Sequence, residues 1–172
     1  MAQTKTNGAV PVYGKDHILA FRLFDERASK GATKLALQTK HSWKFEAKSD
    51  STETKDGNIN SPATASATLE IEAIASLDEV NEMLRGAVMS SKMLEVWDIN
   101  LADKRSDNKY GAQYARGYLQ SWEVPSEIGK LTEIKTTMNV EQLPVEGEAT
   151  LTEEQQSAIQ YAFADTNPAT EG

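Results

Sequence analysis

The sequence has no cysteine, which excludes disulfide bonds, thiolate zinc sites and a cysteine nucleophile. This absence is consistent with assembly in a reducing cytoplasm. Long apolar runs are also missing, since no window approaches the roughly 18 consecutive apolar residues of a membrane span. The polar N-terminus, Met1–Gly8, lacks the apolar segment of a signal peptide. We therefore expect a protein that is made and kept inside a cell and has no membrane partner.

Positive charge is scarce, with 18 Lys and Arg against 26 Asp and Glu and a net charge of -8. A basic nucleic-acid-binding surface is therefore not expected. Residues 1–60 carry ten basic against seven acidic residues, and the remainder carries eight against nineteen. Such a chain could pair head to tail with copies of itself, although unselected surface variation explains the asymmetry equally well. The 172 residues suffice for one domain with a hydrophobic core.

Enzyme motifs are missing too: there is no phosphate-binding glycine loop, no nucleophile elbow and no metalloprotease helix. Of the two histidines, His41 has the buried parity of its predicted strand and is expected in the core or at an interface. His17 follows Asp16, but adjacent strand residues point to opposite faces and do not converge on one atom. We predict no catalytic residue, no metal site and no cofactor.

Acidic residues form two candidate sites. Glu70 and Glu72 lie on one face of a predicted strand, close enough to share a cation or to act as a carboxylate pair. Asp98, Asp103 and Asp107 surround a polar turn that could bind calcium. Neither group matches a glycine-turned calcium loop, so a solvated strand face and a solvated turn are the favoured interpretations.

Alternation of apolar and polar residues dominates the chain and predicts a mainly β fold. Residues 33–48 and 64–75 show the clearest period of two. The other predicted strands are residues 17–24, which are apolar enough to be buried on both faces, 92–101, 109–124 and 131–142. Within 109–124 the aromatic residues recur every four positions, which also suits a helix, but Gly111 and Gly117 favour a strand.

Two helices interrupt the predicted strands. Ser76 and Glu79 form a capping box ahead of a helix over residues 77–88, whose apolar residues fall at helical spacing. Thr152 and Gln155 repeat the capping signature and predict a short C-terminal helix, followed by a flexible tail.

Residues 48–63 separate the two best strands and are almost entirely polar, with Ile59 as the one sizeable apolar side chain. We predict a long loop here, because the segment cannot bury enough apolar surface to order itself and loops of this length are usually functional or disordered. The alternative is a tight hairpin that turns at Asp56-Gly57 and lengthens the strands. In both cases the segment projects and needs a partner to become rigid.

Several stretches, taken in their order and spacing, carry a resemblance to a known family. They are Lys15–Leu19 with Leu23–Asp25, Ala32–Ser42, Asp50–Gly57, Glu95–Asp98, Gly117–Leu119 and Ala149–Gln155. Together they resemble the major tail protein family of long-tailed phages that infect Gram-positive bacteria. The similarity runs from about Lys15 to Thr166, nearly the whole chain.

The resemblance implies a tail-tube type β-sandwich or barrel of two packed sheets flanked by one α-helix. The expected regions are an N-terminal arm (1–14), a tail-tube β domain (15–148), and a C-terminal helix with a flexible tail (149–172). Subunits of this family form hexameric rings that stack into a conduit for DNA ejection, in the virion after assembly in the host cytoplasm. Implied partners are other copies of the chain, a tape-measure protein and tail terminator or baseplate proteins, while DNA passes without sequence-specific binding.

The resemblance also suggests which residues act in assembly. Residues 48–63 correspond to a loop that orders against neighbouring subunits, and its inter-subunit residues are Asp50, Ser51, Thr52, Glu53, Lys55, Asp56, Gly57 and Ile59. Terminal arms, Met1–Tyr13 and the segment after Glu148, are expected to bridge rings. Glu70 and Glu72 suit an acidic lumen along which DNA slides. A basic row on the neighbouring strand opposes this, and whether it is lumenal or inter-subunit stays open; its members are Lys34, Lys40, Lys44 and Lys48.

Two other functions stay open. A carbohydrate-binding β-sandwich module of a phage baseplate or decoration protein would use the aromatic row, if that row were exposed instead of packed in the core, which is the default. The members of the row are Tyr110, Tyr114, Tyr118 and Trp122. A hydrolase would use Glu70 and Glu72.

Overall fold

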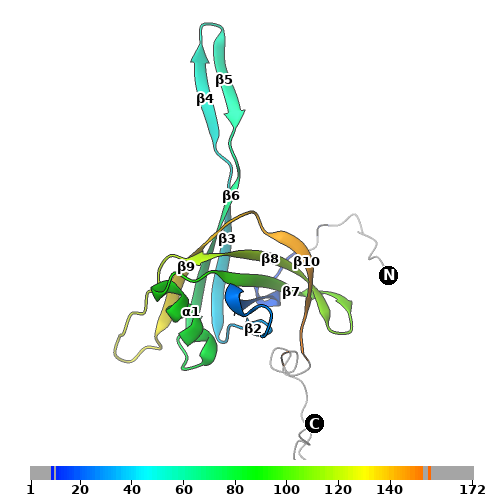
Figure 1. Cartoon of the computed structure of the whole chain (residues 1–172), viewed down its shortest axis with the longest axis vertical. Helices are drawn as coiled ribbons and strands as arrows, with labels where there is room; N and C mark the ends of the chain where they lie inside the picture. Colours follow the sequence, from blue (N-terminus) through cyan, green and yellow to red (C-terminus); the bar gives the residue numbers. More distant parts are fainter. Residues whose placement is uncertain (1–8, 10, 153–154, 156–172) are drawn as a thin grey trace, which may run out of the picture.

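The computed structural model describes residue 9, residues 11–152 and residue 155 of the chain. These residues form a mainly β body from which one two-stranded hairpin, β4–β5, projects (Figure 1). Within the described part of the chain, no helix is long and apolar enough to cross a membrane.

Short 3-10 turns, ten strands and one α-helix follow one another along the described chain. In order they are η1 (Gly14–Asp16), β1 (His17–Leu23), η2 (Phe24–Glu26), β2 (Thr33–Lys34), β3 (Gln38–Glu46), β4 (Ser49–Thr54), β5 (Gly57–Pro62), β6 (Ser66–Ile74), α1 (Glu79–Met89), β7 (Leu94–Ser106), β8 (Lys109–Leu119), β9 (Glu133–Val140) and β10 (Val145–Thr150).

Eight of the strands form one antiparallel sheet in the order β2-β1-β7-β8-β9-β6-β3, with β10 paired to β8. The sheet curls until β3, at one end of this order, lies against β1 and β7. The side-chain amide of Gln38 joins β3 to β1, because Leu19 N–H donates to Gln38 Oε1 (2.9 Å) and Gln38 Nε2 donates to Leu19 O (3.0 Å). We refer to this junction as the seam. The predicted mainly β fold with one flanking helix is confirmed.

The body has two apolar clusters, one on each face of β1. The first includes the buried face of α1 and side chains from most of the strands: Leu19, Phe21, Leu35, Leu69, Ile71, Ala73, Val80, Leu84, Ala87, Leu94, Val96, Ala115, Leu119 and Met138. The second consists of Ile18, Ala20, Ile99, Tyr110, Ala149 and Leu151. Because successive residues of β1 enter different clusters, the strand is buried on both faces, as its continuous apolar run predicts.

The predicted strand over residues 33–48 is interrupted in the structure. It divides into β2 and β3 at a corner where Leu37 has a φ of 52° and is exposed. Leu35 and Leu37 share one parity, yet Leu35 is buried and Leu37 is not. The prediction was wrong here because alternation reports which side chains share a face, and a single left-handed residue can redirect the backbone without disturbing the pattern.

The segment 48–63 is a hairpin and not a loop, so the alternative interpretation is the correct one. Strands β4 and β5 pair in register from Ser49↔Pro62 to Thr54↔Gly57. The turn needs Gly57, whose φ of +126° is rarely adopted by residues with a side chain. The long-loop prediction failed because it considered apolar burial alone, whereas backbone pairing between the two halves orders this segment.

Helix α1 begins two residues later than predicted, and its N-cap is Asp78 instead of Ser76. The Asp78 carboxylate accepts from Asn81 N–H at 2.8 Å, while Ser76 Oγ hydrogen-bonds to the other Asp78 oxygen. A carboxylate at this position also interacts favourably with the helix dipole, which a serine cannot do. Leu77, the first residue of the predicted helix, precedes the observed helix and is fully exposed.

The C-terminal part of the described chain differs from the prediction in one strand. Strand β10 was not anticipated, although Ala149 from it is buried in the second cluster. The second capping box has the expected geometry: Thr152 N–H donates to Gln155 Oε1 at 3.1 Å and Gln155 N–H donates to Thr152 Oγ1 at 3.2 Å. The rest of the predicted C-terminal helix and tail lies outside the described residues.

Candidate assembly surfaces and the Asp98 cluster

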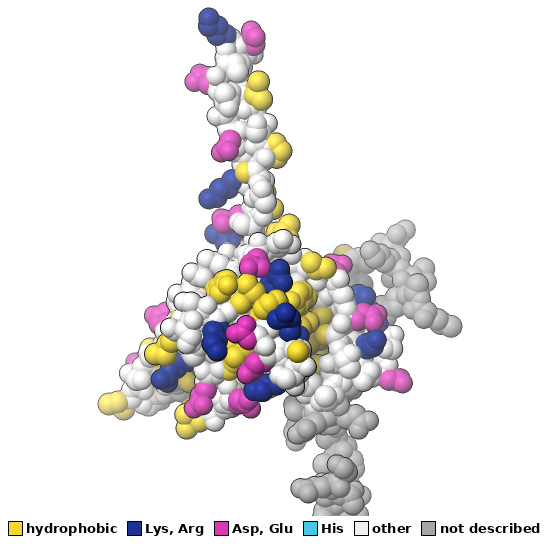
Figure 2. All heavy atoms as spheres, in the orientation of Figure 1, with side chains coloured by type: hydrophobic (Ala, Val, Ile, Leu, Met, Phe, Trp, Pro, Cys, Tyr) yellow, Lys and Arg dark blue, Asp and Glu magenta, His cyan; other side chains and the backbone are white. Residues whose placement is uncertain are grey.

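The hairpin displays every residue predicted to act between subunits. Asp50, Ser51, Thr52 and Glu53 lie on β4, Lys55 and Asp56 form the turn, and Gly57 and Ile59 lie on β5; all of them are exposed. Figure 2 shows apolar side chains along one side of the arm and charged ones along the other. Ile59 remains 59% exposed and is paired across the hairpin with Thr52. The arm is thus an ordered projection with an unburied apolar side chain.

Glu70 and Glu72 lie on the polar face of β6, in the middle of the ladder β3-β6-β9. Glu72 is opposite Lys40 on one side and Lys135 on the other, and Glu70 is opposite Ser42 and Thr137. Opposite charges therefore alternate across these three strands. The face is mixed in charge and not uniformly acidic, which a reading of one strand at a time cannot establish.

The basic row does not form one continuous line. Lys34 lies on β2, beyond the corner at Leu37, while Lys40 and Lys44 lie on β3 and Lys48 follows that strand. Lys34 and Lys40 line a pocket of about 920 Å³ beside the seam, together with Lys15. Lys44 instead pairs with Glu46 at 3.2 Å on the polar face. The four lysines are therefore shared between the pocket and the β3-β6-β9 face.

Three members of the aromatic row are packed. Tyr110 is 1% exposed, Trp122 packs against the first cluster, and Tyr114 lies against Trp97 with ring centroids 5.3 Å apart. Tyr118 is 38% exposed. The core interpretation is therefore correct for Tyr110 and Trp122, whereas Tyr114 is half-buried outside both clusters. These residues do not form the exposed aromatic platform that a sugar would stack on.

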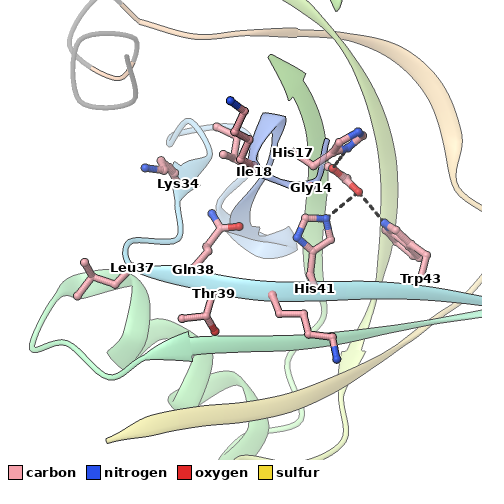
Figure 3. Close-up of a pocket in the computed structure, with 12 residues that line it drawn as sticks. Gly14, His17, Ile18, Lys34, Leu37, Gln38, Thr39, His41 and Trp43 are labelled. Atoms are coloured by element: carbon pink, nitrogen blue, oxygen red, sulfur yellow. Dashed lines mark hydrogen bonds and ion pairs between the residues drawn. The ribbon is translucent and has the colours of Figure 1, made fainter. Parts of the chain in front are cut away.

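Asp98 joins residues that are distant in sequence. Its carboxylate accepts from His17 Nδ1 at 3.0 Å, from His41 Nε2 at 3.1 Å and from the Trp43 indole N–H at 2.9 Å. In Figure 3 the side chains of His17 on β1 and of His41 and Trp43 on β3 converge on this one carboxylate. We call these four residues the Asp98 cluster. It lies at the seam and lines the pocket beside it.

The environment of Asp98 keeps it ionised. Burial raises the pKa of this carboxyl, but the hydrogen bonds from His41, His17 and Trp43 outweigh burial and place the pKa below its ordinary value of 3.8. The side chain is 93% buried, and three N–H groups satisfy much of its capacity as an acceptor.

Sequence reasoning did not find the Asp98 cluster. It grouped Asp98 with Asp103 and Asp107, but Asp103 pairs with Arg105, and among the described residues the group close enough to hold a metal joins Asp98 to His17 and His41 instead. It gave His41 a buried parity, and it treated Asp16 as a strand residue, whereas Asp16 lies in η1 ahead of β1. The sequence offered one signal, which is that it contains two histidines. The structure directs both of them to the same carboxylate.

Comparison with known proteins agrees with this architecture. The profile of the phage tail tube protein family matches residues 11–146. A tail protein of Staphylococcus phage phiMR25 is 27% identical over 161 residues, which cover 90% of this chain and 82% of that protein.

Solved structures of tail components share the fold. The SPP1 tail tube, determined by solid-state NMR and cryo-EM, superposes with a TM-score of 0.69 at 19% identity and covers 94% of this chain and 91% of its own. The tail of an empty GTA particle, refined with C6 symmetry, gives a TM-score of 0.58 at 12% identity and covers 83% of this chain and 100% of its own.

Proposed function

The chain belongs to the phage tail tube protein family and is a structural subunit of the virion tail, and from that premise we propose that it assembles into hexameric rings stacked into a tube. The observation that carries this proposal is the hairpin: a paired arm that stands off the body and presents polar backbone and Ile59 to solvent. The sixfold arrangement is transferred from the C6 symmetry of the GTA tail. We propose that the subunit acts by assembly and not by catalysis, without a catalytic cofactor.

The arm would act by packing against a neighbouring copy of the chain. An exposed isoleucine on a polar arm gains free energy when a second surface covers it, about 1.5–3 kcal/mol for full burial. Strand β10, which pairs with β8, supplies a strand edge through which rings could close. The expected further partners are a tape-measure protein and tail terminator or baseplate proteins, and the terminal arms would bridge rings.

Deletion of Asp50–Asn60 tests the role of the arm. The expected product is a folded subunit that does not form tubes, because both hydrophobic clusters lie in the body and the arm contributes to neither. Circular dichroism and thermal unfolding check the fold, and negative-stain electron microscopy of concentrated protein checks assembly. Tubes of normal appearance from the deleted chain would contradict the proposal.

We also propose that the polar face of β3, β6 and β9 lines the lumen, with Glu70 and Glu72 keeping DNA from adhering. The flanking Lys40 and Lys135 are opposite Glu72, so their charges are offset locally. A lumen of this kind conducts DNA without holding it, because phosphate contacts to unpaired lysines give salt-dependent binding.

Charge reversal at this face provides the test. Tubes of the double variant Glu70→Lys, Glu72→Lys should retain DNA at low salt and release it as salt rises, measured by co-sedimentation. The matched control is Asp107→Lys, Glu127→Lys, which reverses the same number of charges on exposed residues outside the named strands. Equal DNA retention by both double variants would show that the β6 face does not line the lumen.

A further inference from the structure

The Asp98 cluster brings together three groups that bind transition metals. His17 Nδ1, His41 Nε2 and an Asp98 carboxylate oxygen all lie within 4.8 Å of one another, from strands β1, β3 and β7. Imidazole nitrogen and carboxylate oxygen are both ligands of zinc. We propose that His17, His41 and Asp98 form a binding site for a divalent transition metal, with zinc as the expected ion, which fastens β3 to β1 and β7 at the seam.

The distances are close to those of a tetrahedral site. Zinc bonds to nitrogen and oxygen of about 2.0–2.1 Å set neighbouring ligands about 3.3 Å apart. His17 Nδ1 lies 3.0 Å from Asp98 Oδ1 and His41 Nε2 lies 3.1 Å from Asp98 Oδ2. An ion between the two nitrogens would therefore face both carboxylate oxygens, and each separation needs to open by only a few tenths of an ångström. The two ring nitrogens must approach one another, which rotation of the imidazoles about their side-chain bonds allows.

The second shell of the site is already in place. The Trp43 indole N–H holds one oxygen of the Asp98 carboxylate at 2.9 Å, and outer hydrogen bonds of this kind orient metal ligands. Because the three protein ligands face a pocket of about 920 Å³, a water or anion can take the fourth position. Lys15 and Lys34 in that pocket would favour an anion there.

Charge also favours a cation at the cluster. Asp98 is a buried carboxylate on strand β7, and its hydrogen bonds come from the N–H groups of His17, His41 and Trp43. A divalent ion would replace the two histidine hydrogen bonds with coordination bonds and would balance the buried negative charge. Two nitrogen ligands select zinc, cobalt, nickel or copper over magnesium and calcium, which prefer oxygen.

Metal titration of the full-length, untagged, chelator-treated chain tests the site. Co²⁺ should produce visible d–d absorption that saturates at one ion per chain, Zn²⁺ should displace it, and Zn²⁺ should raise the melting temperature. His17→Gln and His41→Gln should each weaken Zn²⁺ binding by at least about tenfold, since even outer-shell losses cost that much. Glu70→Gln, Glu72→Gln is the matched control, because it removes the other candidate cation pair and should leave binding unchanged.

Histidine-detected NMR of the unmodified chain keeps the test valid if a variant misfolds. Zn²⁺ should shift the ¹⁵N resonances of His17 Nδ1 and His41 Nε2 specifically. Dissociation constants weaker than about 100 µM would overturn the proposal. So would equal binding by folded histidine variants, or ¹⁵N shifts confined to other nitrogens.

Discussion

At the scale of single residues, Asp98 shows how much of a site depends on strand pairing. Its partners His17 and His41 are 81 and 57 positions away in sequence, and both arrive only because β1 pairs with β7 and β3 closes the seam. Local pattern correctly gave the parity of His41 but could not identify the carboxylate it faces. Contacts of this range depend on how the whole sheet curls, which alternation in one strand does not record.

We expect Asp98→Asn to destabilise the metal-free subunit by about 2 kcal/mol at neutral pH, because an amide cannot accept from all three N–H groups and turns a donor toward them. The pKa of Asp98 is depressed in the folded state, so its contribution is fully present above the ordinary value of 3.8 and is lost as pH falls through the lower folded-state value. Urea unfolding at a series of pH values checks both points. Below pH 3.8 the stability of the parent chain should fall toward that of the variant; a gap that stays constant on acidification would contradict this.

At the scale of elements, period-two alternation located the body strands, and the region between predicted strands located the arm. What it missed has identifiable causes. The corner at Leu37 lies within an unbroken pattern, and β10 carries four exposed residues in succession before its one buried side chain. Composition alone predicted that Gly117 favours a strand. The structure shows that glycine is also required there for packing, because a Cβ would come within 1.9 Å of the Asn139 carbonyl oxygen on β9.

Mutations at the start of α1 can distinguish the observed Asp78 cap from the predicted capping box of Ser76 and Glu79. Asp78→Ala should cost about 1 kcal/mol of unfolding free energy, because it removes the acceptor for Asn81 N–H at the first turn. Glu79→Ala should change stability by less than about 0.5 kcal/mol, since its exposed side chain makes only a long contact with Lys30. Chemical denaturation of the two variants measures both. Equal losses of unfolding free energy in the two variants would support the predicted capping box between Ser76 and Glu79 instead.

At the scale of the whole molecule, the body and the arm have different physical supports. The body is held by two apolar clusters, whereas the arm is held by its backbone ladder and carries Ile59 uncovered. A change on the arm should therefore affect association without affecting the fold of the body. This separation makes assembly testable independently of stability.

Ile59→Asp should abolish tube formation while leaving the unfolding midpoint of the unassembled subunit unchanged, because the side chain is already 59% exposed. Asn58→Asp is the control, since it adds the same charge at the neighbouring position, which points to the opposite side of the arm. Sedimentation velocity and negative-stain microscopy report assembly. Loss of tubes in both variants would attribute the effect to charge and not to contact at Ile59.

The arm has one further consequence, for the subunit before it assembles. A two-stranded ribbon leaves an unpaired row of backbone N–H and C=O groups along each of its outer sides, and such rows are templates for indiscriminate strand addition. The strands that expose them, SDSTET and GNINSP, are rich in Ser, Thr and Asn, carry two acids and end in Pro62. Low hydrophobicity and a terminal proline disfavour amyloid-like stacking. The polar composition of the arm gives it no apolar alternation by which a strand could be predicted. The same composition protects a concentrated pool of free subunits from aggregation.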